Sequence, residues 1–574
     1  MARSIELVSE QASAAATSAG VKRREWVEAL ESHAVVVLVL LAVLGFGLRI
    51  GGISRIGFAE DEINKLEAAR AYEQGNITPN AEHPMLMKTL IFVSMRAARA
   101  WNDAHVGAAP ANNRITDETA VRLPNIILGA LTIFPLFLLT ASFFERRTAL
   151  LAAALWAFGI NAVTYNRIAK EDTLLVFFML FAFYFYVRAK QTSGFDAQTK
   201  RRNYILSGIS FALMLASKYF PHYFGLNMLY HHFVHVRGER EPGEPRGGTP
   251  WIFYLVVAVA FIVANPSLLL PQTWQYLSAY SSEGLLTHRG YLMGATLYDN
   301  LMSKTPFGGT PVYFYLLFML IKMPLPLLVA FGVGLIEIVR RRKEAGAAFL
   351  LLMSVLWIVP YSLAGAKWLR YTLSLLPFVY MTAAVGIVAL VRWCARLKQG
   401  AATSLSRVST PWPHVVWGAA AVFVFVALPA WTAYAHNPHY ALYTNALAAN
   451  RAGYYFPHDE FYDDGLREAV NFICERAPVG ATVAHETPGV VRYYLQRCGR
   501  TDLRSRTISD VQYNPLDAPT DTFVIMQRGR TYFENREELE SVRASDAFER
   551  VYDGRISGAS AVEIYASATR KPSV

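Results

Sequence analysis

Three consecutive carboxylates, Glu60-Asp61-Glu62, are the first residues in this sequence whose types and spacing could move a proton. They follow the first long apolar run after a short connection, Arg55-Ile56-Gly57-Phe58. One interpretation is a general base, because a carboxylate fixed at a helix start can be held beside an incoming hydroxyl. The other is a solvated acidic loop or a helix N-terminus, where Asp61 would complement the helix dipole. Spacing alone leaves both interpretations open.

A second polar segment, residues 80–88, brings together a carboxylate, an imidazole and an amine in Glu82, His83 and Lys88. Glu82 and His83 alone supply only two metal ligands, fewer than a zinc site needs. A polar cluster around an anionic headgroup is the better interpretation. We therefore expect no definite cofactor. If a divalent metal binds, Glu82 and His288 are its candidate ligands.

A third segment, residues 165–172, contains Arg167, Lys170, Glu171 and Asp172. The basic residues either pair with the neighbouring carboxylates or bind a phosphate, for which arginine offers bidentate donors. Further basic residues that we place on the same side of the membrane are Lys218, His288, Arg289, Lys304, Lys367 and Arg370. Together they predict a basic pocket against the bilayer, where a lipid-linked phosphate is the natural anion.

The composition shows what must position these residues. The chain has 574 residues, of which 53% are hydrophobic and 17% charged, and its mean hydropathy is +0.24. Soluble domains carry about 25% charged residues. Apolar runs of roughly 20 residues recur, each long enough to cross a bilayer core of about 30 Å. Soluble and disordered classes are excluded. The net charge of +11 lies at the ends of apolar runs, which excludes nucleic-acid binding and indicates topology signals.

The apolar runs predict a polytopic α-helical membrane protein of about eleven transmembrane helices. The expected spans are roughly residues 34–50, 119–143, 148–165, 171–188, 203–218, 220–236, 251–270, 310–337, 345–364, 371–392 and 413–433. Residues 1–33 form a polar N-terminal segment, which we expect in the cytoplasm. The apolar run that follows is not succeeded by a small-residue cleavage site, so we expect it to remain as a membrane anchor.

Charge asymmetry predicts the orientation. With the N-terminus in the cytoplasm, every strongly basic short loop falls on the cytoplasmic side, as the positive-inside rule requires. The transmembrane module then covers residues 34–433, with a long first extracytoplasmic loop at 51–118. An odd number of spans places residues 434–574 outside the cell (inner) membrane.

The tail, residues 434–574, predicts a small extracytoplasmic α/β domain, because short apolar runs alternate with helical patterns. Cys474 and Cys498 both fall in it, where oxidation can occur, and we expect them to pair. Two buried thiols are the alternative. Cys394 falls in a cytoplasmic loop and is expected to be a free thiol.

Several motifs resemble those of one family. Asp61-Glu62 resembles its Asp-Glu pair in the first outer loop, and residues 82–88 resemble its acidic-x-x-Pro-Leu-x-Lys segment, although Glu82 directly precedes His83. Further matching stretches are Asn166-Arg167 with Asp172, Ile321 to Pro326, and Lys367 with Arg370-Tyr371 and Pro377. In these motifs the chain resembles the GT-C membrane glycosyltransferases. The group it is most similar to is the dolichyl- or polyprenyl-phosphate-mannose protein mannosyltransferases (glycosyltransferase family 39) and their bacterial relatives.

The resemblance implies an inverting glycosyltransferase that moves a mannose-like or pentose sugar from a polyprenyl-phosphate donor to a hydroxyl of a protein, lipid or glycan. It implies that Asp61 takes the proton of the acceptor and that Glu62 or Glu82 orients hydroxyl groups. The remaining donor-binding candidates are His83, Lys88, Arg167, Lys170, Asp172, Lys218, His288, Arg289, Lys367, Arg370 and Tyr371. The tail does not resemble the β-trefoil insertion of the eukaryotic members. A transporter or flippase for a lipid-linked or anionic substrate is the alternative from another class.

Overall fold

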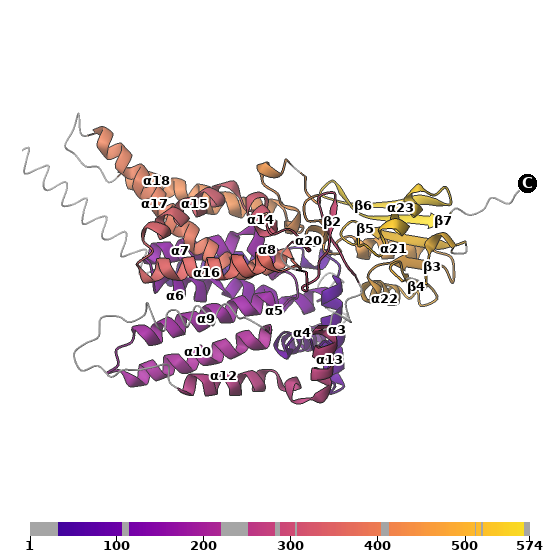
Figure 1. The fold of residues 1–574 in the computed structure, drawn as a ribbon, viewed down its shortest axis with the longest axis horizontal. Helices are drawn as coiled ribbons and strands as arrows, with labels where there is room; N and C mark the ends of the chain where they lie inside the picture. The colour runs from indigo at the N-terminus through magenta and orange to yellow at the C-terminus, as the bar shows by residue number, and fades with distance from the viewer. Residues whose placement is uncertain are drawn as a thin grey trace, which may run out of the picture.

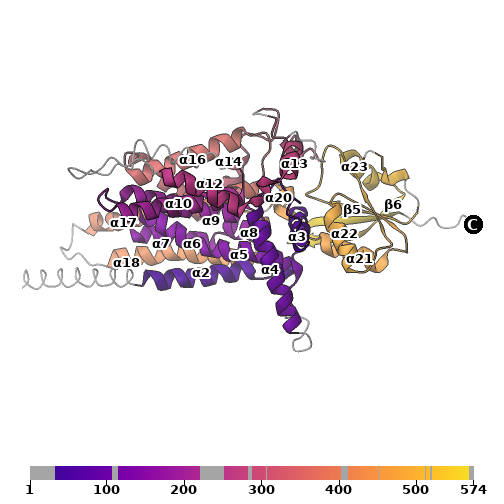
Figure 2. The same cartoon turned by 90° about the horizontal axis from the view of Figure 1, so that it is seen from below.

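The computed structural model describes residues 33–105, 114–219, 251–281, 288–304, 307–402, 412–449, 451–510, 512–517 and 520–567. A bundle of long helices forms one end of the elongated molecule, and a smaller part built around a sheet forms the other (Figure 1). Helix α3 (Glu60–Glu73) lies between the two parts (Figure 2). The carboxylates of the first loop therefore stand at a junction.

The bundle consists of helices that run mainly along the long axis (Figure 1). They are α2 (Ala34–Ile50), α5 (Asp117–Leu131), α6 (Ile133–Ala141), α7 (Arg146–Phe158), α8 (Ile160–Asn166), α9 (Asp172–Gln191), α10 (Ala197–Ser217), α12 (Trp251–Ala264), α14 (Phe314–Lys322), α15 (Leu325–Arg340), α16 (Ala345–Leu363), α17 (Leu376–Ala402), α18 (Trp412–Val422) and α19 (Leu428–Ala435). Shorter elements at the junction are α4 (Met85–Ala104), α13 (Pro271–Ser281), η5 (Leu369–Ser374), α20 (Pro457–Phe461) and the hairpin of β1 (Tyr291–Met293) with β2 (Thr296–Tyr298).

Six stretches of the described residues are long and apolar enough to cross a membrane, or seven if the bent pair α7–α8 is one span. The expected number of about eleven is not confirmed. The expected span 310–337 is broken between α14 and α15 at Pro324, α12 has only 14 residues, and α10 begins with the charges of residues 200–202. The expected span 220–236 lies outside the described residues.

The bend between α7 and α8 is 56° and falls at Gly159. A Cβ at Gly159 would lie 2.3 Å from the hydroxyl oxygen of Tyr380, so only glycine fits the close approach of α17. The bend directs α8 toward the short connection 167–171, which carries Arg167, Lys170 and Glu171.

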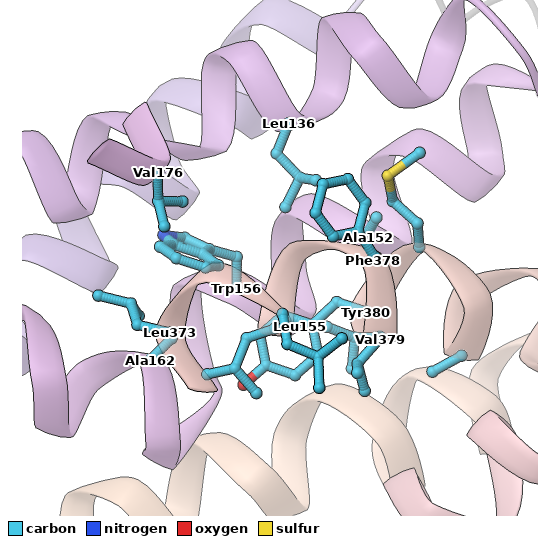
Figure 3. Close-up of a cluster of buried hydrophobic side chains, with 14 of the residues drawn as sticks. Leu136, Ala152, Leu155, Trp156, Ala162, Val176, Leu373, Phe378, Val379 and Tyr380 are labelled. Carbon is cyan, nitrogen blue, oxygen red and sulfur yellow. The ribbon is translucent and has the colours of Figure 1, made fainter. Parts of the chain in front are cut away.

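The core of the bundle is built around Trp156 and Tyr380. Their rings meet edge to face with centroids 6.2 Å apart, and the indole of Trp156 donates to the carbonyl of Gly129 at 2.7 Å. Leu136, Leu155, Phe378 and other apolar side chains surround them (Figure 3). This packing fixes α7, α9 and α17, whose ends at the junction carry the polar residues described below.

The C-terminal part holds a five-stranded mixed sheet in the order β4-β3-β5-β7-β6. Its strands are β3 (Thr482–His485), β4 (Arg504–Thr507), β5 (Thr522–Gln527), β6 (Phe548–Ile556) and β7 (Ala559–Ser567), and its helices are α21 (Leu466–Arg476), α22 (Pro488–Arg497) and α23 (Arg536–Ala544). Strands β4, β3 and β5 are parallel, whereas β7 and β6 are antiparallel additions. Strand β5 is buried along its whole length, as expected for a central strand with both faces covered.

A disulfide joins Cys474 in α21 to Cys498 at the end of α22, with an S–S distance of 2.03 Å, and Cys394 is a free thiol. Helix α22 packs against α3, and the hydroxyl of Tyr494 accepts a hydrogen bond from the backbone N–H of Phe58 at 2.7 Å. The sheet domain therefore rests directly on the first loop.

Candidate active site

Asp61, in the first turn of α3, is the centre of a cluster of charged side chains from distant segments. Its carboxylate lies 2.7 Å from Lys170 Nζ and 3.3 Å from Arg370 Nη1, and it accepts a hydrogen bond of 2.6 Å from the hydroxyl of Tyr462. The Asp61 side chain nevertheless keeps 30% of its surface exposed. Four segments thus hold one carboxylate that solvent or substrate can still reach.

These cations control the ionisation of Asp61. Burial alone would raise the pKa of its carboxyl group, but Lys170, Arg370 and Lys65 hold that pKa well below its usual value. Burial lowers the pKa of Lys170 to about 8, against the opposing effect of Asp61. Asp61 is therefore an ionised acceptor at neutral pH, and one of its partners titrates just above neutrality.

Glu171 is the centre of a second, buried ion cluster beside the first. Its carboxylate lies 3.0 Å from Lys65 Nζ and 3.6 Å from His83 Nδ1. Burial holds the pKa of His83 well below its usual value in spite of Glu171, so the imidazole is neutral at pH 7. Because Lys65 is one helical turn after Asp61, it links the two clusters along one face of α3.

Lys218, at the end of α10, adds a partly exposed cation. Its Nζ lies 2.7 Å from Asp172 and 4.1 Å from the centre of the Tyr371 ring. Arg370 lies over Tyr371 and Trp368, at 5.7 and 5.4 Å from the two ring centres. The exposed fractions of the Lys218 and Arg370 side chains are 26% and 15%, so both cations can contact an anion.

Glu62 does not share the surroundings of Asp61, and its expected contact with substrate stays a prediction. Its carboxylate, 1% exposed, receives two hydrogen bonds from the guanidinium of Arg122. It also accepts the backbone N–H groups of Ala59 and Ala169 at 3.1 and 2.9 Å. Glu62 therefore fixes the start of α3 against the connection 167–171, which positions Asp61 beside Lys170.

Arg167 and Lys367 are likewise occupied by the protein itself. Arg167 Nη1 donates to the carbonyls of Leu48, Arg49 and Gly51 at the end of α2, at 3.3, 3.0 and 2.6 Å. Lys367 donates to the carbonyls of Thr310 and Ala364, and it is fully buried. Both close helix or loop ends, and their expected contact with a phosphate stays a prediction.

The segment 80–88 turns back on itself. Lys88, 1% exposed, donates to the carbonyls of Pro79, Asn80 and His83 at 3.2, 2.6 and 2.9 Å. Glu82 accepts from the side chain of Asn80. Lys88 therefore shapes the loop that presents His83, while Glu82 and His83 remain partly exposed.

His288 and Arg289 belong to the sheet domain side of the junction. The imidazole of His288 stacks on Tyr532 with centroids 4.6 Å apart and lies 3.9 Å from Glu486. The backbone N–H of Arg289 donates to Glu534 at 2.9 Å. None of these contacts brings His288 to Glu82, and the described residues contain no group of three or more His, Cys, Asp or Glu suited to hold a metal.

The site also uses residues that sequence analysis missed. Glu60, the first of the three consecutive carboxylates, lies 2.8 Å from Arg530 of the sheet domain, and its backbone N–H donates to Asp463. Arg530 in turn binds Asp463 through two guanidinium nitrogens. Tyr462 and Asp463 both have positive φ, 44° and 68°, which is costly for residues other than glycine and is typical of functional sites.

Two parts of the chain match known protein families. Residues 114–270 match the family described as dolichyl-phosphate-mannose-protein mannosyltransferase, and residues 295–453 match the Alg9-like mannosyltransferase family. The first range contains Lys170 and Lys218, and the second contains Arg370. No curated protein sequence matches the chain.

A solved structure shares the fold. ArnT from Cupriavidus metallidurans in the apo state superposes with a TM-score of 0.50 at 13% identity, over 94% of this chain and 100% of that one. The same ArnT bound to undecaprenyl phosphate gives 0.47 at 12% identity, over 94% and 99%. An Archaeoglobus fulgidus oligosaccharyltransferase with a tethered acceptor peptide gives 0.48 at 10% identity, over 94% and 74%.

The helical bundle with its polar junction therefore has the same fold as ArnT. The chain resembles the GT-C membrane glycosyltransferases in two stretches that match mannosyltransferase families, and it shares the fold of ArnT.

Proposed function

We propose that this protein is an inverting glycosyltransferase that moves a sugar from a polyprenyl-phosphate donor to a hydroxyl acceptor, with Asp61 as the base. The observation that carries the proposal is a single reachable carboxylate held between Lys170, Arg370 and Tyr462. A carboxylate in this setting can accept a proton while the adjacent cations bind an anion. Mannosyltransferase family matches and the fold shared with ArnT support this class of reaction.

In the proposed reaction, the acceptor oxygen attacks the anomeric carbon and its proton passes to Asp61. The bond from the anomeric carbon to the phosphate oxygen breaks, and that oxygen keeps the electron pair. Arg370 and Lys218, the two partly exposed cations, stabilise the phosphate as its charge grows. Direct displacement inverts the anomeric centre.

Arg370 links the binding of the donor phosphate to the basicity of Asp61. It is one of the cations that keep the pKa of Asp61 low against the effect of burial. A donor phosphate that takes Arg370 as its partner weakens that effect, so the pKa of Asp61 rises toward the range of an efficient base. Donor binding thus prepares the base for the acceptor.

The positive-inside distribution of arginines and lysines supports an extracytoplasmic site in the cell membrane, with the N-terminus in the cytoplasm. On that side no nucleotide sugar is available, which favours a lipid-linked donor. Mannose and pentoses are the sugars that the family relationships favour, and the acceptor is a hydroxyl of a protein, lipid or glycan.

The test supplies the purified protein with a panel of radiolabelled polyprenyl-phosphate sugars and a membrane extract as acceptor source. We expect one donor to be consumed, and Asp61→Asn to lower transfer at least 100-fold, as loss of a general base does. Glu67→Gln is the matched control, because Glu67 is exposed on the same helix. Full transfer by Asp61→Asn would show that Asp61 is not the base. If the unmodified protein consumed no lipid-linked sugar, the proposed reaction would be refuted.

A further inference from the structure

A cavity of about 790 Å³ opens at the end of the bundle opposite to Asp61. Helix α9 shows the separation, because Asp172 at its start lies in the candidate active site, whereas Gln191 at its end donates to the carbonyl of Ser142 beside the cavity. The walls come from the α6–α7 turn, α15 and α17. The lining residues are Phe143, Phe144, Glu145, Thr148, Val333, Ile336, Glu337, Arg340, Arg341, Val385, Val388, Ala389, Leu390, Arg392, Trp393 and Arg396.

The lining has two chemically different parts. Valine, leucine, isoleucine and aromatic side chains of α15, α17 and the turn form an apolar wall. The polar part combines four arginines with two glutamates, so it is positively charged. Such a change from apolar wall to basic rim matches an amphipathic ligand with an anionic end.

Two of the four arginines are already neutralised. Arg392 lies 2.6 Å from Glu145, and Arg341 donates to Glu344 at 2.9 Å. In the part of the chain that the structure describes, Arg340 and Arg396 pair with no carboxylate, and both are exposed. In the described residues, one cavity therefore presents two guanidinium groups that make no ion pair, with Glu337 also in the lining, and these groups favour a phosphate ligand.

We propose that this cavity binds an anionic membrane phospholipid, with its phosphate at Arg340 and Arg396 and its acyl chains along the apolar wall. Basic pockets between transmembrane helices on the cytoplasmic side bind anionic headgroups, and 790 Å³ is within the range of ligand pockets of about 300–1,000 Å³. A free phosphate would use the arginines but leave the apolar wall uncovered. The lipid would join α15 to α17, and the segment before α17 carries Arg370.

The site rests on the cavity alone and not on the proposed reaction. Its test uses the full-length protein, purified in a neutral detergent, with phosphatidylglycerol, phosphatidylcholine of the same acyl chains, and inorganic phosphate. Native mass spectrometry counts bound lipid, and the shift in melting temperature reports stabilisation, since a ligand that binds the native state raises it.

We expect phosphatidylglycerol to bind at least 10-fold more tightly than phosphatidylcholine. Arg340→Gln with Arg396→Gln should remove this difference, whereas Arg342→Gln with Lys343→Gln, which deletes the same charge outside the cavity, should keep it. Val388→Trp should lower phosphatidylglycerol binding with all arginines in place, because it fills the wall.

Three results would overturn the proposal. Equal binding of the two lipids would show that the headgroup charge is not recognised. Unchanged binding in the Arg340/Arg396 variant would show that the lipid does not bind in this cavity. If millimolar inorganic phosphate raised the melting temperature as much as phosphatidylglycerol and displaced it, the site would be one for a free anion.

Discussion

The adjacent carboxylates Asp61 and Glu62 should respond to amide substitution in opposite ways. Successive residues of an α-helix point about 100° apart, so the two side chains enter different surroundings. Glu62 is 1% exposed and bonded to Arg122, which is 3% exposed. Asp61 keeps 30% of its surface in contact with solvent.

The structure sets the magnitudes. Glu62→Gln leaves the guanidinium of Arg122 buried without its counterion, and breaking a buried pair in this way costs about 3–5 kcal/mol. Two backbone N–H groups, of Ala59 and Ala169, also lose a charged acceptor. Asp61 is partly solvated, and buried Lys170 beside it can give up its proton because burial lowers its pKa to about 8, so we expect Asp61→Asn to cost less than Glu62→Gln.

Thermal unfolding of the purified protein in detergent, followed by tryptophan fluorescence, measures both effects. We expect Glu62→Gln to lower the melting temperature by several degrees and Asp61→Asn to lower it less while abolishing transfer. Arg122→Gln and the double variant complete a cycle, and the double variant should lose less than the sum of the single losses. The reasoning fails if Glu62→Gln melts like the unmodified protein but is inactive, because Glu62 would then act on substrate.

Two further predictions concern the environment of Asp61. Tyr462→Phe removes the hydroxyl that donates to its carboxylate at 2.6 Å, and a hydrogen bond to a charged group contributes about 1.5–3 kcal/mol, so transfer should fall roughly 10- to 100-fold; an unchanged rate would show that the hydroxyl only packs there. Transfer should also fall above pH 8, because burial lowers the pKa of Lys170 to about 8, and the neutral amine no longer holds the Asp61 carboxylate in place or attracts the donor phosphate. Lys170→Arg should abolish this alkaline decline. Lys88→Arg should not, although burial lowers the pKa of Lys88 to about 8 as well, because Lys88 binds backbone carbonyls; loss of the decline in both variants would contradict the assignment.

Part of this site could be predicted from the sequence. Lys170, Lys218 and Arg370 were expected near Asp61 because each follows or precedes an apolar run on one predicted side of the membrane. The structure brings all three residues to the junction, because helix ends on the same side of the membrane lie together at one end of the bundle. Topology alone therefore carries much of the information about the location of the site.

The roles of individual charged residues could not be predicted in the same way. An arginine on the predicted outer side needs a partner, and we expected a phosphate for Arg167. Its partners are instead the unpaired carbonyls at the end of α2, which a sequence does not display as charges. Similarly, Arg530 donates hydrogen bonds to Asp463 and Glu60. These residues come together only when the sheet domain docks on the first loop, and the sequence does not show how it docks.

The number of spans is not confirmed, for a related reason. Hydropathy counts apolar residues in a window and does not detect a break such as Met323-Pro324, where one apolar run becomes two short helices. Lys322, at that break, pairs with Glu460 and donates to the carbonyls of Ala441 and Tyr443 at 2.8 and 2.9 Å. The broken helix thus serves to fix the segment before Tyr462.

The hydrogen bond from Tyr462 to Asp61 spans 401 residues of chain, and this separation has a consequence for biosynthesis. At about 5–20 residues per second, a ribosome needs roughly 20–80 s to add the residues between them. During that interval Asp61 lacks Tyr462, and Glu60 lacks Arg530. The proposed sugar transfer should therefore be absent until the sheet domain has been synthesised and has docked on the first loop.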